Sequence, residues 1–198
     1  MYVLSLLVIF CLSICSYSQD TAGATPLPED DPKNFPYQDA RKLAELGGTH
    51  WVKRRTYEVT TLQGKPTCEY AKILDKVKED VYNLELGAKL GSKWTSKQQT
   101  LSLETTDSHP APNVLKFTRL RADGRLGHPL LYSDYKNCHI VRIKKKDSEE
   151  YRCDLLLTNG AAKQNPPPEC ETKFQEYCSG IPVEVYSDDC DKKSPEAA

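Results

Sequence analysis

Apolar and polar residues alternate along most of the chain between residues 49 and 158. The clearest case is the segment VYNLELGAKL, residues 81–90, whose apolar positions are Tyr82, Leu84, Leu86, Ala88 and Leu90. Successive side chains of a β-strand point to opposite faces, so these residues would share one face and their polar neighbours the other. The pattern therefore predicts strands that are buried on one side.

Eight segments of this kind can be identified, at residues 50–60, 68–74, 81–90, 98–104, 114–120, 129–134, 139–145 and 151–157. Turn signals such as Gly91-Ser92 and Asp123-Gly124 separate them, and no helical pattern intervenes. Short strands at regular spacing favour antiparallel up-and-down pairing. We therefore expect an all-β fold, either a barrel or a sandwich.

Helical periodicity replaces this alternation on both sides of the strands. Residues 37–48, YQDARKLAELGG, predict a short helix that ends at two glycines. After three prolines at 166–168, the stretch ECETKFQEYCSG predicts a second helix. Its apolar positions, spaced i, i+4, i+7 and i+8, are Cys170, Phe174, Tyr177 and Cys178. That spacing forms one helix face, which we expect to pack against the sheet.

The two ends of the chain differ from its middle. Residues 1–18 contain no charged side chain and include an apolar run from Val3 to Cys15, which is typical of a secretory signal peptide. The alternative, a membrane anchor, requires about 18–25 apolar residues. We expect residues 19–36 to be a flexible lead-in, 37–190 a single domain and 191–198 a flexible tail.

Composition and motifs exclude several functions. The chain has 198 residues and a net charge of −1, which offers no overall field for nucleic acid or an anionic membrane. The histidines and cysteines show no metal-ligand spacing, and no GxSxG, HExxH or CxxC motif is present. We therefore expect a monomer without metal, cofactor or catalytic activity that binds a small molecule.

Six cysteines remain after the signal peptide, which predicts up to three disulfides in an oxidising compartment. The two cysteines on the buried face of the C-terminal helix should join that helix to neighbouring strands. The proposed pairs are Cys138–Cys170, Cys153–Cys178 and Cys68–Cys190. A permutation of one or two pairs is the alternative, because sequence does not fix connectivity.

A helix that follows eight strands packs on the outside of a barrel, so the cysteines of the last two strands would point outward. Alternation then turns His139, Val141 and Ile143 inward on one strand, and Arg152, Asp154 and Leu156 inward on the next. An ionisable group inside a barrel is costly without a partner, so Asp154 becomes a candidate binding residue. The alternative is a structural pair with Arg152 or a tyrosine.

An ordered set of short segments resembles the tick salivary lipocalins, the histamine-binding protein family. The segments are YQDARKLAEL, TYEV, the strand at Cys68, LLYSDYKNC, CDLL and PPPEC followed by two further cysteines. The resemblance covers about residues 37–190. It implies an eight-stranded antiparallel lipocalin barrel with a short N-terminal helix and an external C-terminal helix. It also implies secretion in saliva and sequestration of host histamine, serotonin, leukotrienes or thromboxane.

The family's amine-binding members have two acids that this sequence changes. His139 stands directly after Cys138, where they have an acid, and Asp154 stands in an Asp-Leu-Leu sequence where they have Glu-Leu-Trp or Glu-Leu-Tyr. An acid early in their fifth strand corresponds to Gln98 or Gln99. By the same resemblance, Tyr57 is retained and Glu45 lies near an acid of a second, weaker site.

The basic residues before Tyr57 leave the ligand open. If Tyr57 faces inward, alternation turns Arg55, Lys53 and Trp51 inward as well, and two basic groups suit a carboxylate. A one-residue bulge would instead turn Lys53 and Arg55 outward. Trp51 and Trp94 either line the pocket or belong to the core.

Three functions therefore compete: binding of a biogenic amine, binding of an eicosanoid or fatty acid, and interaction of the surface loops with a host protein. Family resemblance favours the amine. The candidate ligand-binding residues are Glu45, Trp51, Arg55, Tyr57, Trp94, His139 and Asp154.

Overall fold

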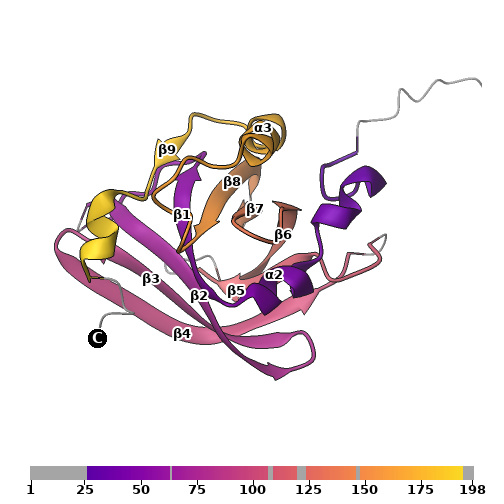
Figure 1. The fold of residues 1–198 in the computed structure, drawn as a ribbon, viewed down its shortest axis with the longest axis horizontal. Helices are drawn as coiled ribbons and strands as arrows, with labels where there is room; N and C mark the ends of the chain where they lie inside the picture. Colours follow the sequence, from indigo (N-terminus) through magenta and orange to yellow (C-terminus); the bar gives the residue numbers. More distant parts are fainter. Residues whose placement is uncertain (1–25, 63, 107–108, 120–123, 146–147, 194–198) are drawn as a thin grey trace, which may run out of the picture.

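Eight antiparallel strands close into a barrel in the computed structural model, which describes residues 26–62, 64–106, 109–119, 124–145 and 148–193 (Figure 1). The strands are β1 (Gly48–Arg55), β2 (Pro66–Lys78), β3 (Val81–Leu90), β4 (Lys93–Glu104), β5 (Val114–Thr118), β6 (Arg125–Ser133), β7 (Cys138–Lys145) and β8 (Ser148–Thr158). Each pairs with the next along the chain, and β1 pairs with both β8 and β2. This last pairing closes the ring and decides for a barrel over a sandwich. A two-residue strand, β9 (Val183–Glu184), adds to β1.

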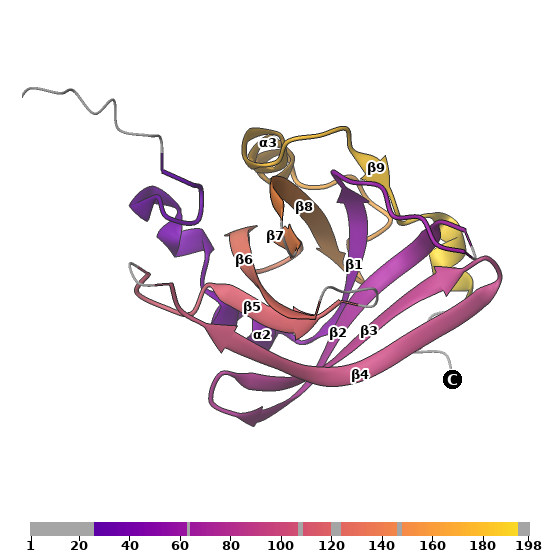
Figure 2. The same ribbon diagram turned by 180° about the vertical axis from the view of Figure 1, so that it is seen from behind.

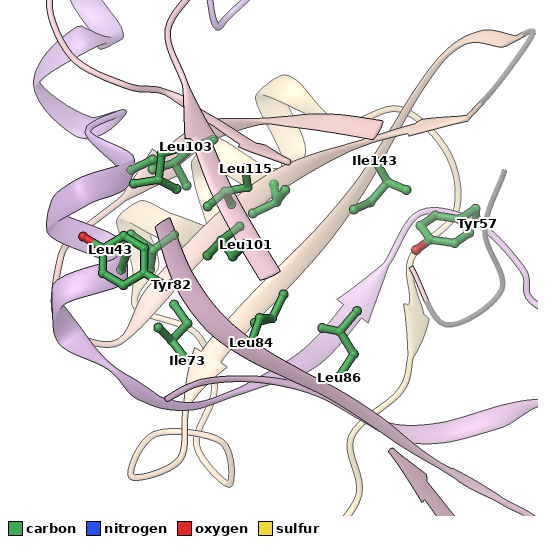
Figure 3. Packing of buried hydrophobic residues seen from close by; sticks show 14 residues of the cluster. Leu43, Tyr57, Ile73, Tyr82, Leu84, Leu86, Leu101, Leu103, Leu115 and Ile143 are labelled. Carbon is green, nitrogen blue, oxygen red and sulfur yellow. The ribbon is translucent and has the colours of Figure 1, made fainter. Parts of the chain in front are cut away.

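The residues that alternate in the sequence form the strands of the barrel wall. β3 has the bounds that the pattern predicts, and Tyr82, Leu84, Leu86 and Ala88 are buried along it. Leu84 and Leu86 join Leu101 and other apolar side chains of the neighbouring strands in one core cluster. The interior is therefore packed with apolar side chains over much of its length (Figure 3).

A short helix closes one end of the barrel. α2 (Ala40–Leu46) begins after Asp39, whose side chain accepts hydrogen bonds from the backbone N–H groups of the first turn. Its buried residues Ala40, Leu43 and Ala44 belong to the same cluster as the inward-facing strand residues. The helix is too short to be stable alone, so this packing holds it in place.

The chain N-terminal to α2 already contacts the barrel. A 3-10 helix, η1, spans Pro32–Tyr37, and Glu29 forms a buried ion pair of 2.6 Å with Arg142 of β7. Gln38 Nε2 donates to the carbonyl oxygens of Pro28 and Leu131. The packed domain thus extends N-terminal to the boundary expected at residue 37. The expected signal peptide lies outside the described residues, as do residues 19–25 and 194–198.

A second helix packs on the outer face of the barrel. α3 (Pro168–Tyr177) lies outside the barrel against β6 and β7, and the apolar cluster beneath it also includes outward side chains of β8 (Figures 1 and 2). Its buried residues Cys170, Phe174 and Tyr177 meet the outward face of the strands, which includes Leu155 and Leu157. The helix face predicted from the sequence is therefore the buried one.

Disulfides join this external layer to the barrel. The structure pairs Cys138 with Cys170, Cys153 with Cys178, and Cys68 with Cys190, as proposed from the sequence. The last bond closes a loop of 122 residues and fixes the C-terminal 3-10 helix η2 (Asp188–Lys193) near the start of β2. Each bond is worth about 2–4 kcal/mol to a domain of this kind.

Candidate ligand-binding site

Two chambers lie inside the barrel. The outer chamber has a volume of about 960 Å³ and a rim formed by residues 59–62 with Pro66 and Leu90. The inner chamber measures about 70 Å³ and lies at the closed end, beside Leu43 of α2. The residues that line both chambers are Ala71, Phe117, Asp154 and Leu156. A ligand in the outer chamber can therefore extend toward the inner one at this shared wall.

Asp154 stands at the boundary between the chambers. The residue is 6% exposed, and its Oδ1 atom has no hydrogen-bond partner among the residues described. In the β1–β8 ladder it lies opposite Arg55, and in the β7–β8 ladder opposite Val141. The inward orientation predicted by alternation is thus observed, with one carboxylate oxygen left open toward the cavity.

Arg55 neutralises part of the negative charge at this end of the interior. Its guanidinium lies 3.0 Å from Glu69 Oε1, and the Arg55 side chain is 2% exposed. Burial lowers the pKa of Arg55, but the carboxylates of Asp154 and Glu69 outweigh that effect and hold it above its ordinary value. Burial raises the pKa of Glu69, against the lowering effect of Arg55. These charges are therefore coupled rather than independent.

Tyr57 lies at the opposite end of the core cluster from α2, and Figure 3 shows it apart from the leucines. Three guanidinium groups lie over its ring, with Arg55 at 5.3 Å, Arg119 at 5.1 Å and Arg152 at 5.9 Å from the centroid. Arg119 also donates a hydrogen bond to the phenol oxygen. Burial raises the pKa of Tyr57 well above 10, so the phenol is neutral. Arg119 itself lines the outer chamber.

Histidines line the inner chamber. His139 is 1% exposed, faces inward as alternation predicts, and its ring centroid lies 5.0 Å from that of His50. Burial lowers the pKa of His50 to about 4 and that of His139 well below 6.5. Both imidazoles are therefore neutral at pH 7, unlike the charged groups of the outer chamber.

A bulge in β1 corrects the expectation for the residues before Tyr57. The register to β8 shifts between Val52 and Arg54, so Val52 lines the outer chamber and Arg55 faces Asp154. Lys53, at the shift, instead donates to the carbonyl oxygen of Ala162 and lies 5.1 Å from the Tyr186 ring centroid. Of the two orientations left open by the sequence, Lys53 thus has the outward one that a bulge produces, whereas Arg55 has the inward one.

The tryptophans also lie outside the barrel interior. Trp51 pairs with Leu157, which belongs to the outward cluster under α3, and its ring meets Tyr70, Trp94 and Tyr186. Trp51 itself belongs to a separate cluster, which includes the Cys68–Cys190 disulfide. The C-terminal segment buries Trp51 from outside, which explains how a fully buried residue can face away from the ligand cavity.

Glu45 is exposed on α2 and lines neither chamber. Conversely, His50, Glu69 and Arg119 line the chambers although the sequence pattern did not indicate them as binding residues. Glu69 follows Cys68, which has a positive φ of 52°, and the β2–β3 register shifts between Thr67 and Tyr70. This irregularity turns Glu69 toward the cavity, and no alternation pattern signals it.

Two kinds of feature are absent from the residues that the structure describes. No group of three His, Cys, Asp or Glu side chains among them could hold a metal ion. Within the same residues, no helix is long and apolar enough to cross a membrane.

Comparisons with known proteins agree with this architecture. The sequence profile of the family described as tick histamine binding protein matches residues 28–192. No curated protein sequence matches the chain. Among solved structures, the serotonin complex of AM182 is similar with a TM-score of 0.58 and 17% identity, covering 76% of this chain and 91% of AM182.

Two other solved structures share the fold. Japanin from Rhipicephalus appendiculatus, bound to cholesterol, has a TM-score of 0.54 and 14% identity over 73% of this chain and 95% of japanin. Insecticyanin from Manduca sexta has a TM-score of 0.52 and 13% identity over 75% of this chain and 82% of its own. AM182 and japanin were solved with small ligands, serotonin and cholesterol respectively, and the family is one of ligand-binding lipocalins rather than enzymes. The match over most of its length shows that the chain belongs to the tick histamine-binding protein family.

Proposed function

We propose that the barrel binds a small biogenic amine, histamine or serotonin, and that Asp154 is its counter-ion. The proposal is supported by one observation above all: Asp154 Oδ1 is a buried carboxylate oxygen without a hydrogen-bond partner among the described residues, and Asp154 lines both chambers. A protonated amine would supply both the missing hydrogen bond and a positive charge. Phe117, which lines the same wall, offers an aromatic face to the cation.

The size of the outer chamber supports a ligand-binding role over a scaffold role. A chamber of about 960 Å³ is at the upper end of the range for small-molecule sites, which is roughly 300–1,000 Å³. A protein that used only its surface loops would not need such a cavity. The interaction-module hypothesis is therefore the weakest of the three.

Arg119 favours a second candidate, an amphiphile with a carboxylate, such as leukotriene B4, another eicosanoid or a fatty acid. The side chain lines the outer chamber, close to the guanidinium groups that surround Tyr57. Arginine forms strong paired hydrogen bonds with carboxylates. In this arrangement the acid would lie near Arg119 and the apolar chain would extend along Leu86 and Leu156.

In either case the proposed role in the host requires no chemical step. Residues 1–18 would direct secretion into saliva, and the mature protein would lower the free concentration of a host inflammatory or vasoactive mediator by binding it. Such sequestration would suppress host defence at the feeding site in proportion to the amount of protein delivered.

Titration calorimetry of the oxidised protein without residues 1–18 tests both candidates. Histamine, serotonin and leukotriene B4 are compared for the wild type, Asp154→Asn and Arg119→Gln. We expect amine binding that Asp154→Asn weakens by more than tenfold, because the charged hydrogen bond is lost. Glu45→Gln, which removes an exposed acid, is the matched control and should leave the affinity unchanged.

Unchanged amine affinity in Asp154→Asn would refute the proposed counter-ion. Binding of leukotriene B4 alone, weakened by Arg119→Gln, would establish the second candidate instead. Circular dichroism of each variant verifies that a lost affinity does not reflect a lost fold.

A further inference from the structure

Two histidines that line the inner chamber each have a buried ring nitrogen without a hydrogen-bond partner among the described residues. His50 and His139 are 3% and 1% exposed, and both line the chamber. His50 Nδ1 and His139 Nε2 have no hydrogen-bond partner among the residues described. Buried polar atoms usually have a partner in the protein, an ordered water or a ligand. These two atoms therefore point to something that occupies the chamber.

The contacts of His50 determine which of its nitrogens carries the proton. Its Nε2 atom lies 2.9 Å from the carbonyl oxygen of Gly47. A carbonyl oxygen only accepts, so Nε2 is the donor. The neutral ring then has a lone pair on Nδ1, and this open atom is an acceptor.

The contacts of His139 favour the opposite arrangement. Its Nδ1 atom lies 2.9 Å from Ser133 Oγ, and the same oxygen accepts the backbone N–H of Tyr135. Ser133 is fully buried, and among the described contacts of its hydroxyl group only His139 Nδ1 can accept the hydroxyl proton, so we assign Nδ1 as the acceptor. The neutral ring of His139 therefore carries its proton on Nε2, and this open atom is a donor.

The His50 and His139 rings, whose centroids lie 5.0 Å apart, thus offer one hydrogen-bond acceptor and one donor. A neutral ligand group that both donates and accepts can bind the two together. A hydroxyl group donates one hydrogen bond and accepts others, so it can satisfy both imidazoles at once. Burial lowers the pKa of both rings, which keeps them uncharged at pH 7. Apart from Asp154 at the wall shared with the outer chamber, apolar side chains including Leu84, Leu101 and Ile143 form much of the remaining wall, so the rest of the chamber disfavours a charged group.

The size of the chamber limits how much of a ligand can enter it. Its volume is about 70 Å³. A water molecule takes about 30 Å³, whereas a cavity that binds a whole benzene ring measures about 150 Å³. The chamber thus has room for a hydroxyl group and the ring edge that carries it, while the rest of the molecule would remain in the outer chamber.

Resting on the amine function proposed above, we propose that the inner chamber is a hydroxyl subsite, so that the preferred ligand is a hydroxylated aromatic amine. Its ammonium group pairs with Asp154, and its hydroxyl group bonds His50 and His139. His139 lies opposite Leu156 in the β7–β8 ladder, two residues from Asp154 along β8. Two residues of a strand span about 7 Å, a separation that a fused ring with an aminoethyl chain can bridge.

Four indoles separate the hydroxyl effect from the amine effect in calorimetric titrations of the wild type. Serotonin has both groups, tryptamine lacks the hydroxyl, 5-hydroxyindole lacks the amine, and indole lacks both. We expect the hydroxyl to strengthen binding about tenfold in both pairs, because its removal leaves two buried polar atoms unsatisfied. The amine should strengthen binding in both pairs as well.

Each outcome of this comparison is decisive. An amine effect without a hydroxyl effect would overturn the subsite, leave the proposed function intact and mean that the chamber holds water only. A hydroxyl effect without an amine effect would support the subsite and overturn Asp154 as counter-ion. Absence of binding by all four compounds would overturn both.

Variants and spectroscopy locate the effect at the two imidazoles. His139→Phe should make the affinities for serotonin and tryptamine equal, whereas His128→Phe should preserve their ratio, because His128 is equally buried but lines neither chamber. Nitrogen-15 spectra of the wild type avoid any dependence on variant folding. Addition of 5-hydroxyindole should change the nitrogen-15 chemical shifts of His50 Nδ1 and His139 Nε2 and leave those of His128 unchanged. Unchanged chemical shifts for His50 and His139 would refute the assignment.

Discussion

The polar side chains at the open end of the barrel are charged, whereas the imidazoles at its closed end are neutral. At the open end, Arg55, Glu69 and Asp154 are charged groups that meet one another beside a large chamber. At the closed end, His50 and His139 are neutral, and the surrounding wall is apolar. The open end thus contains charged side chains, and the closed end mainly neutral ones.

The difference follows from how each end is covered. α2 and its buried residues seal the closed end, so a charge there would lose its water and find an opposite charge only in Asp154, at the wall shared with the outer chamber. The outer chamber is large enough to admit solvent, and its charged side chains lie close enough to pair. A ligand that spans both chambers would therefore carry its charge at one end only.

Removing a charge from the open end should have the largest effect on stability. Arg55→Ala leaves Glu69 and Asp154 buried without their counter-ion, which typically costs about 3–5 kcal/mol. The measurement is urea unfolding of the oxidised protein at pH 7. The double variant Arg55→Met, Glu69→Gln should lose clearly less, because the unpaired charge at Glu69 is also removed.

Arg125→Ala is the control for that experiment, because Arg125 is an exposed residue whose guanidinium bonds Thr100 and Ser102. A loss for Arg55→Ala no greater than for Arg125→Ala would show that the open-end charges are not coupled as the structure indicates.

Acidification should affect the two ends in opposite directions. The pKa of His50 falls from 6.5 to about 4 on folding, so the unfolded chain binds more protons between these values. Stability is therefore full above pH 6.5 and falls by about 3 kcal/mol as the pH drops to about 4, and His139 acts in the same direction. Burial raises the pKa of Glu69, so Glu69 favours the folded state more as the pH falls.

Urea unfolding of the wild type, His50→Phe and Glu69→Gln between pH 7.5 and pH 4.5 checks these signs. His50→Phe should flatten the loss of stability with acid, and Glu69→Gln should steepen it. Parallel curves for all three proteins would mean that neither group changes its pKa on folding.

Regular segments of this fold could be predicted from the sequence, because alternation and cysteine placement depend on local pattern. β3 has its predicted bounds, and Asp154 and His139 face inward as expected. The irregular segments could not be predicted from the sequence. The shifts at Lys53 and at Glu69 depend on how β1 and β2 pair with their neighbours, and the hydrophobic pattern contains no sign of them.

Trp51 shows a second limit of the pattern. The barrel is covered on its outer face by the C-terminal segment and α3, so outward positions of β1 and β8 are as apolar and buried as inward ones. Alternation then identifies two faces but does not tell which one encloses the ligand. The residues of the outer chamber that were overlooked, Glu69 and Arg119, could be found only from the closed three-dimensional arrangement.

The smallest effect is expected at the rim of the open end, where Leu62 is 108% exposed beside the outer chamber. Leu62→Ser should change the free energy of unfolding by less than about 0.5 kcal/mol, because folding removes no apolar surface of this side chain from water. Leu43→Ser is the matched change at the closed end, where Leu43 is 5% exposed against the inner chamber. It should cost at least about 2 kcal/mol, because it removes buried apolar atoms and adds a hydroxyl group. The measurement is the urea unfolding midpoint of both variants under the same conditions. A comparable loss of stability in both would mean that the rim packs as tightly as the sealed end, and that the two ends do not differ in packing.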